Sequence, residues 1–120
     1  MKRVLVVDDS PSVRKMVAFV LRQGGYDVVE AGDANDAITA AGFGDVRLVI
    51  TDHHLPGDDG IALIRALRSK PHCAHVPIVM LTTEAGAELK CAARAAGATA
   101  WIAKPFDPQR LLSVVDKVLS

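Results

Sequence analysis

The chain has 120 residues, half of them hydrophobic, and its 14 basic and 14 acidic residues leave a net charge of zero. This length is sufficient for one domain with its own core, and balanced charge argues against general nucleic-acid binding, which requires a basic face. No apolar run approaches the roughly 20 residues that span a bilayer. We therefore expect one cytoplasmic domain over residues 1–120, with no nucleic-acid or membrane partner and with reduced thiols at Cys73 and Cys91.

The first half of the chain alternates short apolar runs with segments of helical spacing. Continuous apolar runs are typical of strands covered on both faces, whereas Ser or Asp before a helical stripe is typical of a helix start. Glycines follow these stripes, where helices commonly end. The pattern predicts strands at 4–7, 26–31 and 48–51, and helices from 11 to about 23 and from 33 or 35 to 41.

The second half continues the alternation. Apolar residues from Ile61 to Leu67 recur at helical spacing, and a polar segment between Pro71 and Pro77 follows them. An alanine-rich helical segment ends before Gly97, which suits a helix terminus. The pattern predicts helices near 61–67, at 87–96 and from 107 or 108 onward, with strands at 78–81 and 100–103.

Five strand–helix units in alternation predict an α/β fold with a parallel sheet, helices on both faces and right-handed crossovers. The carboxyl ends of parallel strands lie along one edge, where open α/β sheets bind ligands. Polar residues follow four of the predicted strands at this edge. They are Asp8, Asp9, Asp52, Thr82 and Lys104.

This set of side chains indicates phosphoryl chemistry. Three clustered carboxylates repel one another, and a hard cation such as Mg²⁺ would neutralise them. A carboxylate beside Mg²⁺ can act as a nucleophile toward phosphorus and form an aspartyl phosphate. Lys104 could supply positive charge to the transferring phosphoryl group, and Thr82 offers a hydroxyl donor.

Simpler interpretations exist for several of these residues when each is taken alone. Asp8 and Asp9 could compensate the dipole of the following helix, and Lys104 could be a solvated amine. His72, Cys73 and His75 could suggest zinc, but a fourth ligand is absent and prolines flank them, which favours a solvated loop. The joint placement of all five polar residues at one edge favours a functional site.

Four motifs along the chain resemble those of one family. They are V-L-V-V-D-D, D-H-H-L-P-G-D-D-G, V-M-L-T-T-E and W-I-A-K-P-F. In order and spacing they are similar to the receiver domains of two-component response regulators, and most similar to the single-domain kind typified by the chemotaxis regulator. The resemblance covers roughly residues 3 to 119.

The resemblance implies a doubly wound (βα)5, flavodoxin-like three-layer sandwich with strand order 2-1-3-4-5. It implies that Asp52 is the phosphoacceptor and that Thr82 and Lys104 bind the phosphoryl group. It further implies a Mg²⁺ site formed by Asp9, Asp52, the backbone carbonyl of His54 and, through a water, Asp8. Thr82 and Trp101 would form the switch, and the Lys104–Pro105 peptide would be cis.

The function implied is a signalling switch. A histidine kinase or phosphotransfer protein would phosphorylate Asp52, and a downstream protein would then bind the face formed by the helix near 87–96, the strand at 100–103 and the last helix. With no output domain in residues 1–120, we expect output through binding, by a monomer or weak dimer. The chain would not be an enzyme beyond self-phosphorylation from small donors and self-dephosphorylation.

Two other functions remain open at this point. One is a Mg²⁺-dependent phosphohydrolase with an aspartyl nucleophile; such enzymes usually carry a second acid two residues after the nucleophile, where this chain has His54. The other is a receiver-like module that is not phosphorylated, against which the intact acids, Thr82 and Lys104 count. The effects of His53, His54 and Glu84 on phosphoryl lifetime stay undecided.

Overall fold

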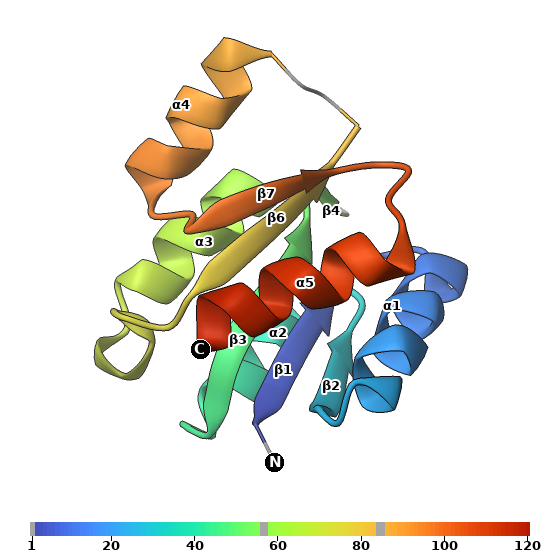
Figure 1. The fold of residues 1–120 in the computed structure, drawn as a ribbon. Helices are drawn as coiled ribbons and strands as arrows, with labels where there is room; N and C mark the ends of the chain where they lie inside the picture. The colour runs from blue at the N-terminus through green and yellow to red at the C-terminus, as the bar shows by residue number, and fades with distance from the viewer. Residues whose placement is uncertain (1, 56–57, 84–85) are drawn as a thin grey trace.

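Five parallel strands form the central sheet of the computed structural model, which describes residues 2–55, 58–83 and 86–120 (Figure 1). Their spatial order is β2-β1-β3-β6-β7, with β1 and β3 at the centre. Counted along the chain, this is the expected order 2-1-3-4-5, so the doubly wound α/β fold is confirmed. The strands are β1 (Arg3–Val7), β2 (Asp27–Ala31), β3 (Val46–Asp52), β6 (Ile78–Thr82) and β7 (Ala100–Ala103).

Helices cover both faces of the sheet (Figure 1). On one face, α1 (Pro11–Gln23) and α5 (Pro108–Leu119) pack through residues such as Leu21 and Leu111. On the other face, α2 (Ala34–Ala41), α3 (Gly60–Arg68) and α4 (Ala87–Ala96) pack against the alternate strand residues. Since side chains point to opposite faces along a strand, each apolar strand contributes to two separate cores.

Four of the five described α-helices begin with a side-chain cap, whereas α4 begins after Gly86 without one. Ser10 Oγ accepts a hydrogen bond from Val13 N, and the carboxylates of Asp33, Asp59 and Asp107 accept bonds from backbone N–H groups in the first turns of α2, α3 and α5. Each cap satisfies an N–H group that has no partner inside the helix. The sequence left two candidate start residues for each of α2 and α5. Asp33, and not Asn35, caps α2, and Asp107, directly before Pro108, caps α5.

The structure adds short elements that the sequence pattern does not predict. β4 (His54–Leu55) and β5 (Asp58–Asp59) form a two-residue antiparallel ladder directly after β3, and a 3-10 helix spans Pro71–Cys73. A two-residue ladder is too short to show a hydrophobic period. The strand β3 also begins two residues earlier than predicted and includes Asp52.

The apolar residues of α5 contact the core of the protein. Leu112, Val114 and Leu119 are partly buried and pack against the core beneath α1 and α5. The large apolar side chains that are exposed, among the described residues, are instead Met16, Phe19 and Phe43. Within the same residues, none of the helices is both long and apolar enough to cross a membrane.

At the amino edge of the sheet, opposite the predicted site, hydrogen bonds from two side chains join separate segments of the chain. Lys2 Nζ donates a hydrogen bond of 2.6 Å to Leu119 O, which joins the two ends of the described chain. The guanidinium of Arg68, at the end of α3, donates to carbonyl oxygens in two separate turns. These acceptors belong to Cys73, Ala74 and Val76 after α3, and to Gly97 after α4.

Candidate phosphoacceptor site

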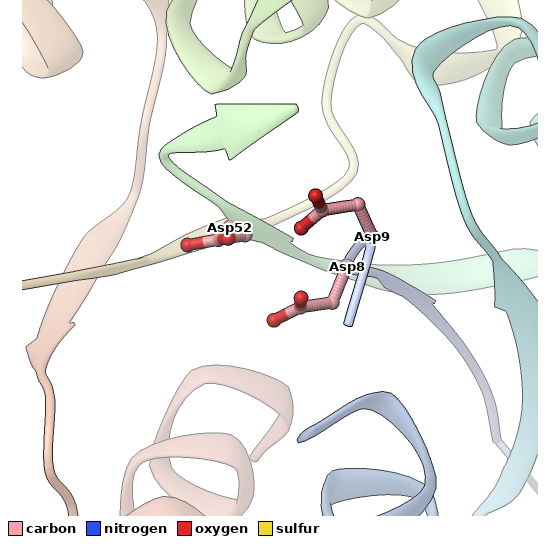
Figure 2. Close-up of side chains that lie close together, drawn as sticks. All are labelled: Asp8, Asp9 and Asp52. Atoms are coloured by element: carbon pink, nitrogen blue, oxygen red, sulfur yellow. The ribbon is translucent and has the colours of Figure 1, made fainter. Parts of the chain in front are cut away.

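Three aspartates meet at the carboxyl edge of the sheet (Figure 2). Asp8 and Asp9 follow β1, and Asp52 is the last residue of the adjacent strand β3. One carboxylate oxygen from each lies within 4.8 Å of the others. The convergence predicted from the strand ends is therefore present, because two central strands end side by side.

Asp8 is the most deeply buried of the three, with 1% of its surface exposed. Its Oδ1 accepts a hydrogen bond of 2.9 Å from Ser10 N. Burial raises the pKa of the Asp8 carboxyl above its usual value, and the charge of Asp52 acts in the same direction. The Ser10 N–H group and the Lys104 ammonium oppose this shift without cancelling it.

Lys104 places its ammonium between two of the carboxylates. Nζ lies 2.9 Å from Asp52 Oδ1 and 3.5 Å from Asp8 Oδ2. The Lys104 backbone N–H donates to Thr82 O at 2.8 Å, which anchors the residue after β7 to the end of β6. The Lys104–Pro105 peptide is cis, as the family resemblance implies.

Hydrogen bonds to β6 and to the start of α3 fix the backbone directly after Asp52. His53 N donates to Leu81 O on β6 at 2.9 Å, and His53 O accepts from Gly60 N at 2.7 Å. A Cβ atom at Gly60 would lie 2.4 Å from Asp52 O, far inside van der Waals contact. Gly60 therefore allows the start of α3 to approach the acceptor strand closely.

The other residues predicted for the site and the switch differ in how exposed they are. Thr82 ends β6 and is buried, with 3% of its surface exposed. His54 is exposed and its ring lies 4.4 Å from the ring of the buried His53. Trp101 lies on β7, partly buried, with Lys90 Nζ and Arg94 Cζ of α4 each 5.4 Å from its ring centroid. Glu84 lies outside the described residues.

The donor set fits a hard divalent cation. All three side chains offer carboxylate oxygens, which are preferred ligands of Mg²⁺. Asp8 Oδ2 is buried and makes no hydrogen bond within the described part of the chain, although Lys104 Nζ is its neighbour at 3.5 Å. A buried carboxylate oxygen without a hydrogen-bond partner has capacity to accept a bond from water or to bind a cation.

Sequence reasoning missed two residues that shape the site. Arg14 on α1 donates from Nη1 to Asp8 O at 2.8 Å and from Nε to Glu30 at 3.2 Å, so it orients the backbone that carries the acids. Its position in the helix gives no local signal of this contact. The role of Gly60 has a weak signal, since the glycine directly follows two acids at a helix start.

The histidines and cysteine near residue 73 lie elsewhere. Cys73 is a buried free thiol in the 3-10 helix, whereas His72 and His75 are exposed at the amino edge. Burial raises the pKa of the Cys73 thiol. Within the described residues, the cluster of three metal-ligating side chains is Asp8, Asp9 and Asp52.

Comparison with known proteins gives one family. A sequence profile of the response regulator receiver domain matches residues 4–116. The phosphate regulon transcriptional regulatory protein PhoB of Escherichia coli is 36% identical over 118 residues, covering 98% of this chain and 52% of PhoB. The chemotaxis protein CheY of Pseudomonas aeruginosa is 32% identical over 117 residues, covering 97% of this chain and 94% of that protein.

A solved structure agrees with these sequence matches. The chemotaxis protein CheY4 of Vibrio cholerae superposes with a TM-score of 0.96 at 39% identity, covering 99% of both chains. The similarity therefore extends along the whole sheet and its helices. The chain nevertheless spans only about half the length of PhoB, as the 52% coverage states.

Proposed function

The chain belongs to the response regulator receiver domain family, and from this premise we propose that Asp52 is the residue that accepts the phosphoryl group. Receiver domains are the phosphoacceptor switches of two-component signalling, and the chain is one of them. The contact between Lys104 Nζ and Asp52 Oδ1, at 2.9 Å, carries the assignment to this aspartate. It places a fixed positive charge beside the candidate nucleophile.

The transfer uses the carboxylate of Asp52 as nucleophile. One Asp52 oxygen attacks the phosphorus of a phosphohistidine, forming a P–O bond as the P–N bond breaks. The electron pair stays on the leaving nitrogen, which takes up a proton so that a neutral imidazole departs. The ammonium of Lys104 and the hydroxyl of Thr82 then bind phosphoryl oxygens, which stabilises the spreading negative charge.

The acid cluster fits Mg²⁺, which this family typically binds in an acidic pocket. Asp9 and Asp52 would hold the ion directly, Asp8 through a water, and His54 through its backbone carbonyl. When bound, the cation would neutralise charge on the carboxylates and on the phosphoryl oxygens. Asp8 Oδ2, which is buried and has no hydrogen-bond partner among the described residues, supports this role.

The output of the switch would be a change in binding surface. A phosphoryl group on Asp52 adds negative charge and acceptor oxygens, and Thr82 would follow it and leave space for Trp101 to rotate inward. The partner face would be α4, β7 and α5. A cavity of about 230 Å³ lies on this face between Trp101 and α4, lined also by Lys90, Cys91 and Arg94.

The partners of the switch follow from the same chemistry. The donor would be a histidine kinase or a phosphotransfer protein in the cytoplasm, and the target would be a protein that prefers the phosphorylated state. We place no catalytic turnover of an external substrate in residues 1–120. The family match does not favour a phosphohydrolase or a silent binding module.

The direct test is phosphoryl incorporation from a small acyl phosphate with Mg²⁺, followed by intact-mass measurement. Wild type should gain one acid-labile phosphoryl group, and Asp52→Asn should gain none because an amide is a far weaker nucleophile. The matched control is Asp36→Asn, an exposed aspartate in the first turn of α2, which should behave as wild type. Incorporation into Asp52→Asn at the wild-type level would remove Asp52 from this role.

The switch itself can be followed at Trp101, the one tryptophan of the chain. We expect its emission to change with donor plus Mg²⁺, to change much less with Mg²⁺ alone, and to be unresponsive to donor in Asp52→Asn. Thr82→Ala should still be phosphorylated but should give a smaller emission change, since phosphorylation shifts the population only through contacts that differ between the two states. A full change in Thr82→Ala would break the proposed link from threonine to tryptophan.

A further inference from the structure

A cavity of about 380 Å³ lies away from the aspartates, at the amino edge of the sheet. It is formed where β3 begins, where the 3-10 helix leads into β6, and where α5 ends. Its volume falls within the range of roughly 300–1,000 Å³ that is common for small-molecule sites. None of the residues assigned to phosphoryl transfer lines it.

The lining of this amino-edge cavity combines two kinds of side chain. Its walls are apolar, made by residues such as Val46, Val76 and Val118. Every charged or titratable side chain in the lining is a cation or an imidazole, and no carboxylate of a described residue lines it. These four are Lys2, Arg47, His72 and His75.

The cationic groups at the cavity remain able to bind a ligand. The guanidinium of Arg47 makes no hydrogen bond or ion pair with any residue in the described ranges. Lys2 uses one of its donors on Leu119 O, and an ammonium has two more. The neighbouring acids, Asp27 and Asp45, are both engaged by Arg3.

We propose that the amino-edge cavity binds a small organic anion, with its phosphate or carboxylate on Arg47 and Lys2 and its apolar body against the valine walls. A planar guanidinium suits the oxygens of either anion, and an apolar wall favours a ligand that is more than a bare ion. This site is independent of the phosphoacceptor role, so each can fail without the other.

The test is a nuclear magnetic resonance titration of the ¹⁵N-labelled chain with phenyl phosphate, without Mg²⁺ so that the acid cluster does not attract the anion. We expect saturable shifts centred on the amides of Arg47, His72 and His75. The dissociation constant should be on the order of millimolar, as is usual for a ligand of so few atoms. Inorganic phosphate and neutral benzyl alcohol should each bind several-fold more weakly.

Variants separate specific binding from general attraction. Arg47→Ala should weaken phenyl phosphate binding about tenfold, in line with loss of a charged hydrogen bond. Lys2→Ala should weaken it less, since its ammonium is shared with Leu119 O. Arg65→Ala is the matched control, because Arg65 is exposed on α3 and does not line the cavity.

Several outcomes would overturn the proposal. These are shifts that do not saturate, shifts centred elsewhere, or equal affinity in Arg47→Ala and wild type. Benzyl alcohol binding as tightly as phenyl phosphate would contradict the anion assignment, and inorganic phosphate binding as tightly would contradict the role of the apolar walls. Shifts of the same amides on raising protein concentration alone would assign the cavity to a second copy of the chain.

Discussion

The two edges of the parallel sheet differ in the charges they collect. At the carboxyl edge, Asp8, Asp9 and Asp52 lie close together, and the ammonium of Lys104 lies beside Asp8 and Asp52. At the amino edge, the charged and titratable side chains that line the cavity of about 380 Å³ are cations and imidazoles, without a described carboxylate. Asp8 and Asp52 at the carboxyl edge are buried, whereas Arg47 and Lys2 at the amino edge are exposed.

This difference shows what a net charge of zero conceals. The 14 basic and 14 acidic residues cancel in the sum, yet the fold separates part of them to opposite ends of the sheet. An argument from composition about partners is valid for the whole surface but not for a single edge. The contrast is between an acid cluster whose oxygens fit a cation and a cavity lined by basic side chains.

The largest effect is expected from removing the cation of the carboxyl edge. Lys104→Met should lower the rate of phosphoryl incorporation from a small acyl phosphate by about 100-fold, because one preorganised positive charge is lost. The rate at saturating Mg²⁺ measures this. Lys117→Met, an exposed lysine on α5, is the control and should leave the rate unchanged. A rate within a factor of about two of wild type would show that Lys104 is not needed.

Gly60→Ala tests how rigidly the carboxyl edge is built. Its Cβ would meet Asp52 O at 2.4 Å, so we expect the free energy of unfolding to fall by about 2 kcal/mol. Denaturant unfolding measures this. Gly86→Ala is the control, because a Cβ there meets nothing within 4 Å; since Gly86 is the N-cap of α4, where Ala is disfavoured, its change should be no more than about 1 kcal/mol. Equal changes in the two variants would contradict the close approach.

Asp8→Asn tests the electrostatic cost of the acid cluster. The folded-state pKa of Asp8 is raised, so the folded state holds this proton more tightly than the unfolded chain. Stability is therefore lost as pH rises from the unfolded pKa, about 3.9, through the raised folded pKa. Without Mg²⁺ at neutral pH, Asp8→Asn should be more stable than wild type, by about 1 kcal/mol.

The pH dependence gives this prediction its control. Below about pH 3.9 Asp8 is protonated in both states, so the advantage of Asp8→Asn should vanish there. Mg²⁺ should also reduce the difference in stability between Asp8→Asn and wild type, because a ligand that binds the folded wild type stabilises it. An advantage that is the same at low and neutral pH would indicate a packing effect in place of a charge effect.

The smallest effect is expected at the amino edge. Arg47 is exposed and pairs with no described residue, so Arg47→Ala should change the free energy of unfolding by less than about 0.5 kcal/mol. Its phosphoryl incorporation should equal that of wild type. Thermal unfolding and the mass measurement check both. A loss of unfolding free energy well above that limit would make Arg47 a structural residue, which would contradict its assignment as a free cation of the amino edge.

The acid site was largely predictable from sequence, whereas the basic cavity was not. Asp8 and Asp52 each follow an apolar run, and in a parallel sheet all such positions lie along one edge. The cavity residues come from segments far apart in the chain, such as Lys2, Arg47 and His75, and no spacing links them. The pairing of β3 with β1 and β6 brings the starts of these strands together, and the end of α5 completes the lining.

The residues after Asp52 show a second limit. His53 is buried, with an Nδ1 that has no described hydrogen-bond partner, and His54 is exposed. Adjacent side chains of an extended segment point in opposite directions, but the sequence does not say which of two identical residues points inward. The ladder between β4 and β5 determines this, and it is too short to be read from a hydrophobic pattern.

The guanidinium of Arg68 has a consequence for how the molecule opens. Its hydrogen bonds join the turn at residues 73–76 to Gly97, with lengths of 2.7 Å to Gly97 O and 2.8 Å to Cys73 O. If either turn moved away, the partly buried guanidinium of Arg68 would lose the carbonyl acceptors in that turn. In hydrogen exchange, the amides of the two turns should therefore become accessible in one cooperative event. The wall of the amino-edge cavity that carries His75 would move with them, as part of the same opening unit.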